Sequence, residues 1–318
     1  MKDETKLSGG YVAAVAAYAL WGIIPLYWQL LNRFDPVELI CHRVFWAFIT
    51  LTIVLVYLKF SDPHSISRHQ QKDIFLGLIY IPVEQRSTVI CWSIVASILV
   101  GVNWLVFVWC VQAKMIVESS LGYFINPLMS VALGVIVLGE RLRWINWVSI
   151  ALAASGVAYL TWQYGSVPYL ALTLALSFGL YGLVKKRASL AAIPGLWLET
   201  MMLFVPAVVY LAYRFVNGIS ALGQDGFGWD LLIASTGPVT TIPLLLFAFG
   251  AQRIPLSTMG LLQFIAPTLQ FWMGWYVMRE PVPAARWFGF VMVWAGLAIY
   301  VASSIWIRSR RIGTVAVE

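Results

Sequence analysis

The chain has 318 residues, of which 61% are hydrophobic and only 11% are charged. Soluble domains contain about 45–50% apolar and about 25% charged residues, so this composition excludes an ordinary soluble protein and indicates a polytopic membrane protein. The net charge is +7, but the basic residues lie in short connections between apolar runs. That placement favours contact with lipid and control of topology, and we expect a lipid bilayer and no nucleic acid as partner.

Ten apolar runs are long enough to cross a membrane, because a span needs about 20 residues. The sequence therefore predicts an all-α protein with ten transmembrane helices. In chain order the runs are 10–31, 37–58, 88–112, 117–138, 144–162, 168–184, 196–214, 230–249, 257–278 and 286–307. The long connection 59–87 begins polar and then carries IFLGLIYIPV, which is too short to span. The acidic N-terminus leads into a full span without a small-residue cleavage site, so we expect no removed signal peptide.

The distribution of Lys and Arg predicts the orientation of the spans. Counting residues at span edges with the adjoining connection, the termini and the connections after spans 2, 4, 6 and 8 hold 15 of the 21 basic residues. The remaining connections hold five, and Arg43 lies within a span. Because basic residues concentrate on the cytoplasmic side, both termini are expected to be cytoplasmic.

The start of span 2 carries an unusual ionisable group, with Glu38, His42 and Arg43 in the run ELICHRVFW. Arginine at a helix centre costs about 2.5–3.5 kcal/mol on insertion scales. In one interpretation Arg43 snorkels outward, since side chains lean toward the helix N-terminus, and His42 pairs with Glu38 four residues earlier. In the other, His42 and Arg43 face a cavity and handle substrate or protons. The sequence leaves both open.

Two further glutamates, Glu118 and Glu199, stand near the starts of spans 4 and 7. Together with Glu38 they are candidates for a proton or charge relay, although a carboxylate in a first helical turn also complements the helix dipole. By contrast, Glu140 and Glu280 end spans 4 and 9, where we expect them to order helix ends and loops and not to bind substrate.

Polar and aromatic residues inside the spans are candidates for lining a substrate cavity. The polar ones are Asn103, Asn126 and Gln263, for which hydrogen bonding between helices is the alternative role. The aromatic ones are Trp21, Trp104, Tyr123 and Tyr181, for which core packing is the alternative.

The two halves of the chain resemble one another at a fixed offset of 140 residues. The run FINPLMSVALGVIVLGE, residues 124–140, matches FIAPTLQFWMGWYVMRE, residues 264–280, without a gap. The match continues to Gly156 and Gly296. Apolar bias does not readily place Pro, Gly and Glu in the same ungapped frame, so the similarity indicates an internal repeat.

The offset corresponds to five spans, and because five is odd the matched spans cross the membrane in opposite directions. The sequence thus predicts a 5+5 inverted-topology repeat, with halves 1–163 and 164–318 in one membrane domain. The first spans match more loosely, AYALWG (17–22) against ALSFGL (175–180). Inverted repeats are typical of secondary transporters, which hold substrate near the midplane between the halves.

Pro127 and Pro267 occupy the same place in the two halves, at the centres of spans 4 and 9. A proline removes one backbone donor and displaces the carbonyl four residues earlier. Lipid cannot satisfy that carbonyl, whereas a neighbouring helix or a wet cavity can. We predict that the two prolines are hinges beside a substrate cavity; the alternative is a kink that serves packing alone.

Eight short motifs are spread over nearly the whole chain: ALWG (19–22), HRVFW (42–46), NWLVFVW (103–109), ESSLGYFINPL (118–128), LGERL (138–142), FGLYGLVKK (178–186), LETM (198–201) and VTTIPLL (239–245). In these motifs, their order and their spacing, the chain resembles the EamA type of the drug/metabolite transporter superfamily, and within it the RarD-type permeases. The family's name refers to chloramphenicol sensitivity, and the resemblance implies transport of a small organic metabolite or drug across the bacterial cytoplasmic (inner) membrane.

Two other classes of function have less support. A membrane-embedded enzyme needs reactive groups that the sequence does not show: the three cysteines have no metal or disulfide spacing, and no G-x-S-x-G, H-E-x-x-H or P-loop motif is present. The other class is a channel or scaffold, and the repeated ring of charges or carbonyls typical of a channel is not seen in the sequence. We expect a transporter without enzymatic activity, cofactor or metal. Substrate, direction of transport, ion coupling and oligomeric state stay open.

Overall fold

The structure is a computed structural model that describes residues 2–61, 83–112, 116–164, 169–187, 192–277 and 284–315. Within these ranges it is built of helices, without strands. In chain order they are α1 (Lys2–Leu30), α2 (Pro36–Ser61), α5 (Val83–Gln112), α6 (Ile116–Ile136), α7 (Trp144–Tyr164), α8 (Tyr169–Arg187), α9 (Ala192–Val216), α10 (Phe227–Ala234), α11 (Thr236–Ala251), α12 (Leu256–Gln263), α13 (Ile265–Trp272), the π-helix η1 (Met273–Val277) and α14 (Ala284–Val315).

Every predicted span coincides with a helix or with consecutive helices, so the all-α prediction is confirmed. Span 8 corresponds to α10 and α11, and span 9 to α12, α13 and η1. Among the described residues, six segments are long and apolar enough to cross a membrane: Leu7–Leu30, Pro36–Tyr57, Arg86–Phe107, Trp144–Gln163, Ala192–Val216 and Phe227–Ala251. The chain is therefore a multi-pass membrane protein. Of the long connection, residues 62–82 lie outside the described residues.

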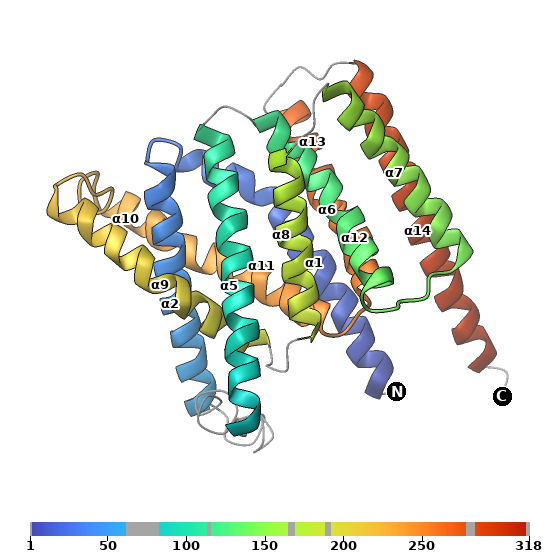
Figure 1. Ribbon diagram of the computed structural model, residues 1–318, viewed down its shortest axis with the longest axis horizontal. Helices are drawn as coiled ribbons and strands as arrows, with labels where there is room; N and C mark the ends of the chain where they lie inside the picture. The colour runs from blue at the N-terminus through green and yellow to red at the C-terminus, as the bar shows by residue number, and fades with distance from the viewer. Residues whose placement is uncertain are drawn as a thin grey trace.

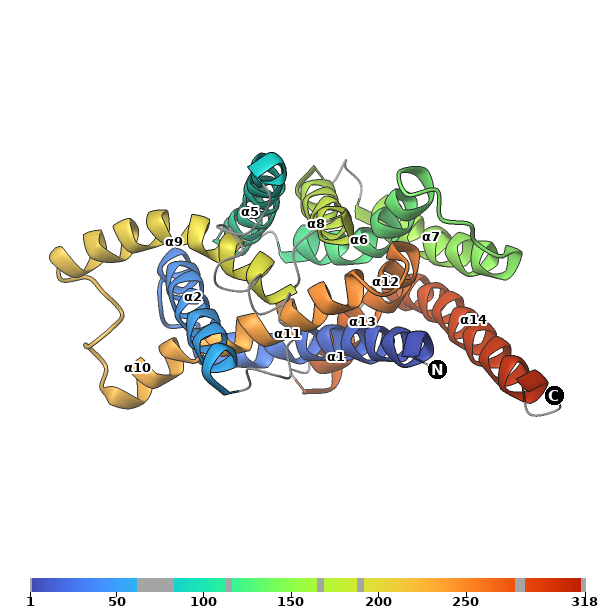
Figure 2. The same ribbon diagram turned by 90° about the horizontal axis from the view of Figure 1, so that it is seen from below.

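The helices form two layers, which Figure 2 shows edge-on. One layer contains α5, α8, α6 and α7; the other contains α11, α1, α13 and α14, with α12 between the layers. Helices α2 and α9 pack together at one end of the molecule, and α7 and α14 pack together at the other (Figure 1). Both chain ends lie on the same side of the bundle (Figure 1).

The contact between α7 and α14 depends on small residues. A Cβ atom at Gly156 would lie 2.7 Å from the carbonyl oxygen of Gly289, and one at Gly296 would lie 2.6 Å from that of Ser149. Glycine at these positions lets the two backbones touch, which is how membrane helices gain dispersion energy without a hydrophobic driving force between them.

Two spans are interrupted, each four residues before a proline. α10 ends at Ala234, before Pro238, and α12 ends at Gln263, before Pro267. The cause is local, because proline has no N–H to bond the carbonyl four residues back. Pro127 does not have this effect, since α6 runs unbroken from Ile116 to Ile136.

Candidate functional site

A cavity of about 300 Å³ lies between the two layers. Helices α1, α2, α5, α6, α8, α11 and α13 contribute to its walls, together with Gln263 at the end of α12. The described aromatic residues that line it are Tyr18, Trp21, Trp28, Trp104, Phe107, Tyr123 and Phe178. The polar ones are Arg43, Asn103, Asn126, Thr240, Gln263 and Gln270.

Seven of the nine predicted cavity residues line this cavity. They are Trp21, Arg43, Asn103, Trp104, Tyr123, Asn126 and Gln263. The structure places the other two, His42 and Tyr181, outside the described lining, in contacts with glutamates. Sequence reasoning did not single out Tyr18, Trp28, Phe178, Thr240 or Gln270 as lining residues, although Phe178 and Thr240 lie in the motifs FGLYGLVKK and VTTIPLL.

Arg43 points into the bundle. Its guanidinium carbon lies 4.0 Å from the centroid of the Trp104 ring and 5.7 Å from that of Trp28. Of the two interpretations of Arg43, the structure therefore favours a cavity-facing side chain over one that reaches the lipid headgroups, because its neighbours are cavity walls on α1 and α5.

Glu38 and His42 form a separate group near the N-terminal end of α2. The carboxylate of Glu38 is fully buried, 2.9 Å from Nη2 of Arg214 on α9, and accepts a hydrogen bond of 2.7 Å from the backbone N–H of Ala221. His42 Nε2 lies 3.8 Å from Glu38 Oε1, as expected for residues four apart on a helix. Glu38 thus ties α2 to α9 and the following loop.

The polar cavity residues also join helices. Asn103 Nδ2 donates to the carbonyl of Leu174 and to Ser177 Oγ, both at 3.0 Å, and so links α5 to α8. Gln263 Oε1 accepts a long hydrogen bond of 3.4 Å from Ser130 Oγ on α6. Asn126 differs, because its Oδ1 is buried without a partner among the described residues.

Two prolines in cavity helices have different surroundings. In α1, Pro25 frees the carbonyl of Trp21, and Gln270 Nε2 on α13 donates to that carbonyl at 3.1 Å. This is the compensation by a neighbouring helix that a membrane interior demands. Pro127 is buried outside the lining, and its carbonyl would lie 2.6 Å from a Cβ at Gly260 on α12.

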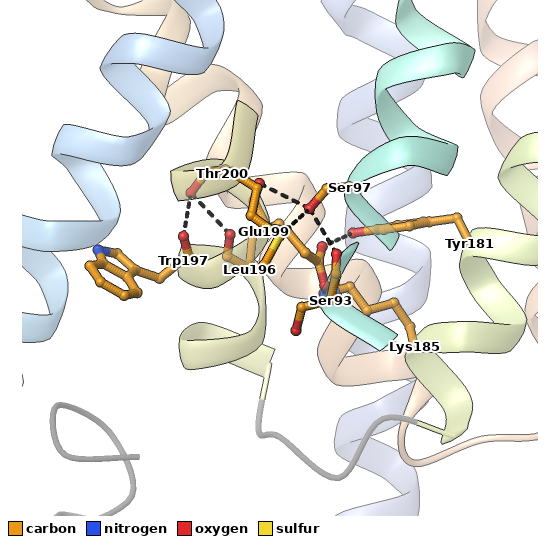
Figure 3. A network of polar contacts seen from close by, with 9 residues as sticks. Ser93, Ser97, Tyr181, Lys185, Leu196, Trp197, Glu199 and Thr200 are labelled. Carbon is orange, nitrogen blue, oxygen red and sulfur yellow. Dashed lines mark hydrogen bonds and ion pairs between the residues drawn. The ribbon is translucent and has the colours of Figure 1, made fainter. Parts of the chain in front are cut away.

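Glu199 belongs to a buried polar network, shown in Figure 3. Its carboxylate pairs with Lys185 of α8 and accepts a hydrogen bond of 3.2 Å from Tyr181 Oη. Its backbone carbonyl accepts a hydrogen bond from Ser97 Oγ on α5 at 3.2 Å. Lys185 directly follows predicted span 6 (168–184) and was counted among the basic residues of the next connection; it is instead 2% exposed within α8, which continues to Arg187.

Glu199 was placed near the start of span 7, but α9 begins at Ala192, seven residues earlier, so the alternative of a first-turn carboxylate that complements the helix dipole does not apply to it. Glu118 does lie in the first turn of α6, and its side chain is outside the described residues. Of the three predicted relay residues, the structure thus places Glu38 and Glu199 in ion pairs between helices.

Glu140 orders a helix end, as predicted. Its carboxylate accepts hydrogen bonds from the backbone N–H groups of Leu256 (2.7 Å) and Ser257 (2.9 Å), at the start of α12. Nearby, Lys186 Nζ donates to the carbonyl of Ile254 at 2.6 Å. Burial lowers the pKa of Lys186 below the ordinary lysine value. Glu280 lies outside the described residues.

Comparisons with known proteins agree with this architecture. The model of the EamA-like transporter family matches residues 8–162 and, separately, 166–302. Protein RarD of Streptomyces exfoliatus is 40% identical over 94% of this chain and 90% of its own, and protein RarD of Escherichia coli is 38% identical over 97% of this chain and 99% of its own.

Two further proteins are similar to this chain over more than 90% of its length. The uncharacterized transporter YojE of Bacillus subtilis is 39% identical over 97% of this chain and 98% of its own. A solved crystal structure superposes with a TM-score of 0.63 over 91% of this chain and 96% of its own at 15% identity, which shows a shared fold. The chain belongs to the EamA-like transporter family, with RarD proteins among its relatives.

Proposed function

We propose that this protein is a secondary transporter that moves a small organic metabolite or drug across the bacterial cytoplasmic membrane by alternating access. The observation that carries this is the cavity between the two layers, with polar side chains from helices of both layers on its walls. A polar cavity inside an apolar bundle is costly unless it serves a solute, because buried polar groups need partners.

A 5+5 inverted repeat is part of the proposal, with halves 1–163 and 164–318. The helix packing supports it, because exchanging each span with the span five places later maps its main contacts onto contacts that are also present. Contacts α6–α8, α5–α8 and α2–α11 become α13–α1, α11–α1 and α9–α5, all of which are present. The two separate matches to one family model agree with this division.

Close contacts at glycines support the same exchange. A Cβ at Gly22 of α1 would lie 2.7 Å from Leu269, and one at Gly179 of α8 would lie 2.9 Å from Met129. Leu269 and Met129 are 140 residues apart, so the contacts correspond. This correspondence pairs Gly22 with Gly179. The looser sequence match of the first spans, 17–22 against 175–180, pairs Gly22 with Leu180 instead, so the two alignments differ by one residue.

Alternating access follows from a difference between the halves. The span that contains Pro267 is broken after Gln263, whereas the span that contains Pro127 is continuous. If the halves exchange conformations, the second state has a straight α12–α13 and a break in α6 near Phe124, the counterpart of Phe264. We propose Pro127 and Pro267 as the hinges of this exchange.

The direction in which the cavity faces follows from chain direction. Its α1 residues run from Tyr18 to Trp28, in the half of α1 away from the N-terminus. With both termini cytoplasmic, the cavity lies toward the outside. The buried Lys185–Glu199 pair, near the cytoplasmic end of α8, then closes the inner side.

A relay role for Glu118 stays a prediction.

The test is flux through purified protein in liposomes, with a mixture of metabolites and chloramphenicol inside and outside. We expect at least one compound to enter the liposomes at a rate that saturates as its outside concentration rises. Its uptake should also be faster when the same compound is present inside the liposomes, as exchange by alternating access requires. Replacing Asn126 and Gln263 by leucine should abolish that uptake. Uptake that does not saturate and does not depend on compound inside the liposomes would favour a channel. Uptake at the wild-type rate by the variant with leucine at positions 126 and 263 would show that the cavity is not on the transport path.

A further inference from the structure

The cavity has one charged residue among its described lining residues, and that residue is Arg43. No aspartate or glutamate is part of this lining. The cavity therefore carries a net positive charge in a region of low dielectric, where an uncompensated charge is costly and a counter-charge is strongly favoured.

Arg43 has no carboxylate partner in the described part of the chain, unlike two other arginines. Arg33 pairs with Asp225 at 2.8 Å, and Arg214 pairs with Glu38 at 2.9 Å. The Nε atom of Arg43 is buried without a hydrogen bond to any described residue. Stacking on Trp104 holds the guanidinium plane in place but uses none of its N–H donors.

Three more polar atoms on the cavity wall lack a partner among the described residues. They are Tyr18 Oη, Asn126 Oδ1 and Thr240 Oγ1, on side chains of residues that are each less than 5% exposed. Buried polar groups without hydrogen bonds cost about 1–3 kcal/mol each. Groups from α1, α6 and α11 therefore offer hydrogen bonds to one solute, alongside the cation.

Much of the remaining wall is formed by aromatic rings. Trp21 packs edge-on against Phe178, with ring centroids 5.6 Å apart, and Tyr123 packs against Phe107 at 6.1 Å. At about 300 Å³, the cavity is at the small end of ligand sites. A flat molecule of one or two rings fills such a space with good contact to aromatic faces.

We propose that the solute is a small organic monoanion, a carboxylate on a flat apolar body, whose carboxylate pairs with Arg43. This inference rests on the proposed function for its meaning as a substrate. The guanidinium fork matches a carboxylate in two parallel hydrogen bonds. One arginine neutralises one negative charge, so a dianion would keep an unpaired charge in the bundle.

Equilibrium binding tests the charge without requiring transport. Cinnamate, cinnamamide and cinnamylamine share a skeleton and carry a negative, no and a positive charge, and calorimetry on the protein in lipid nanodiscs gives each affinity. We expect cinnamate to bind at least tenfold more tightly than cinnamamide, and cinnamylamine least. Equal or weaker binding of cinnamate, or no binding of it, overturns the proposal.

Variants locate the effect. Arg43→Gln should bring cinnamate to the affinity of cinnamamide, while Arg43→Lys keeps the preference in weakened form because it keeps the charge. Arg33→Gln is the matched control at an exposed ion pair and should bind as wild type. A preference that survives Arg43→Gln, in protein that elutes as wild type, overturns the assignment.

Flux separates this inference from the proposed function. If the protein binds cinnamate through Arg43 but moves no compound across liposomes, the proposed transport function is rejected and the anion site stands. If it carries only neutral or cationic compounds through the cavity, the preference for an anion is rejected and the transport function stands.

Discussion

Lys185 and Glu199 are both nearly inaccessible, and each is stable only because the other is present. Taking two ions out of water costs several kcal/mol per ion, which their attraction and the added bond from Tyr181 offset. The pair therefore adds little net stability, but it strongly penalises any state in which α8 and α9 separate. That property suits a closure that has one well-defined geometry.

Breaking this pair from one side should be costly. Lys185→Met leaves a buried carboxylate without its cation and should lower the free energy of unfolding by about 3–5 kcal/mol. Adding Glu199→Gln should recover most of that loss, since Gln still accepts from Tyr181. Thermal unfolding in detergent measures both, with the exposed Arg143→Gln as control. Additive losses in the double variant would mean that the two residues act independently.

Seven of the nine residues predicted for a cavity line it in the structure, because a polar or large aromatic side chain inside a span has few alternatives to an interior position. His42 lies beside Glu38, which is the alternative that their spacing of four residues had left open. Tyr181 instead donates to Glu199, whose partner Lys185 comes from another helix, and such tertiary pairing is not readable from spacing along one helix.

At the level of elements, a proline breaks its helix only in some settings. Pro267 follows a break and Pro127 does not, although their sequences match. The same local chemistry therefore allows both conformations, and the packing of the rest of the molecule selects one for each half. Sequence could predict where a break is possible; it could not say which half is broken in a given state.

Proline to alanine should favour straight helices in both states. Alanine restores an N–H and the bond to the carbonyl four residues back, so Pro267→Ala should heal the break after Gln263. We expect uptake to fall at least tenfold in Pro127→Ala and in Pro267→Ala, with thermal stability unchanged or higher. Pro206→Ala, in unbroken α9 and away from the cavity, is the control. Wild-type uptake in the double variant would leave both prolines as packing features.

Glycine at the α7–α14 contact should be more sensitive than glycine on a surface. Gly156→Ala places a methyl group 2.7 Å from the carbonyl of Gly289 and should cost about 1–3 kcal/mol of unfolding free energy. Gly296→Ala should do the same at Ser149. Gly228→Ala in α10 meets nothing within 4 Å and should stabilise slightly, by helix propensity alone. Equal thermal midpoints for all three would show that the backbones adjust freely.

For the molecule as a whole, the proposed repeat relates the two layers and would give a structure with two equivalent closures. In the described state, Lys185, Met259 and Phe247 are buried, while the cavity residues of α1 lie in the half of that helix away from the N-terminus. The span pattern predicted the all-α architecture, because the lipid environment restricts the chain to helices; the inverted repeat stays a prediction. The position of the layers depends on contacts between distant spans, which the sequence does not display.

Cysteine accessibility tests the whole-molecule scheme. In a background with Cys41, Cys91 and Cys110 replaced by serine, Trp28→Cys marks the cavity and Met259→Cys marks the closed side. A membrane-impermeant maleimide added outside intact cells should label Trp28→Cys quickly and leave Met259→Cys unlabelled. Added to inverted vesicles, it should label Met259→Cys slowly, at the rate at which the other state forms.

The pattern of labelling separates the possible schemes. Transported solute on the inner side should change the rate at Met259→Cys, because it shifts the balance between states, whereas a rigid protein would show no change. Labelling of Trp28→Cys only from the inside would reverse the topology and place both termini outside. Fast labelling of both positions from one side would indicate a continuous path, which fits a channel. Only fast labelling of Trp28→Cys from outside, together with slow labelling of Met259→Cys from inside, fits halves that exchange a bent and a straight span about a closed centre.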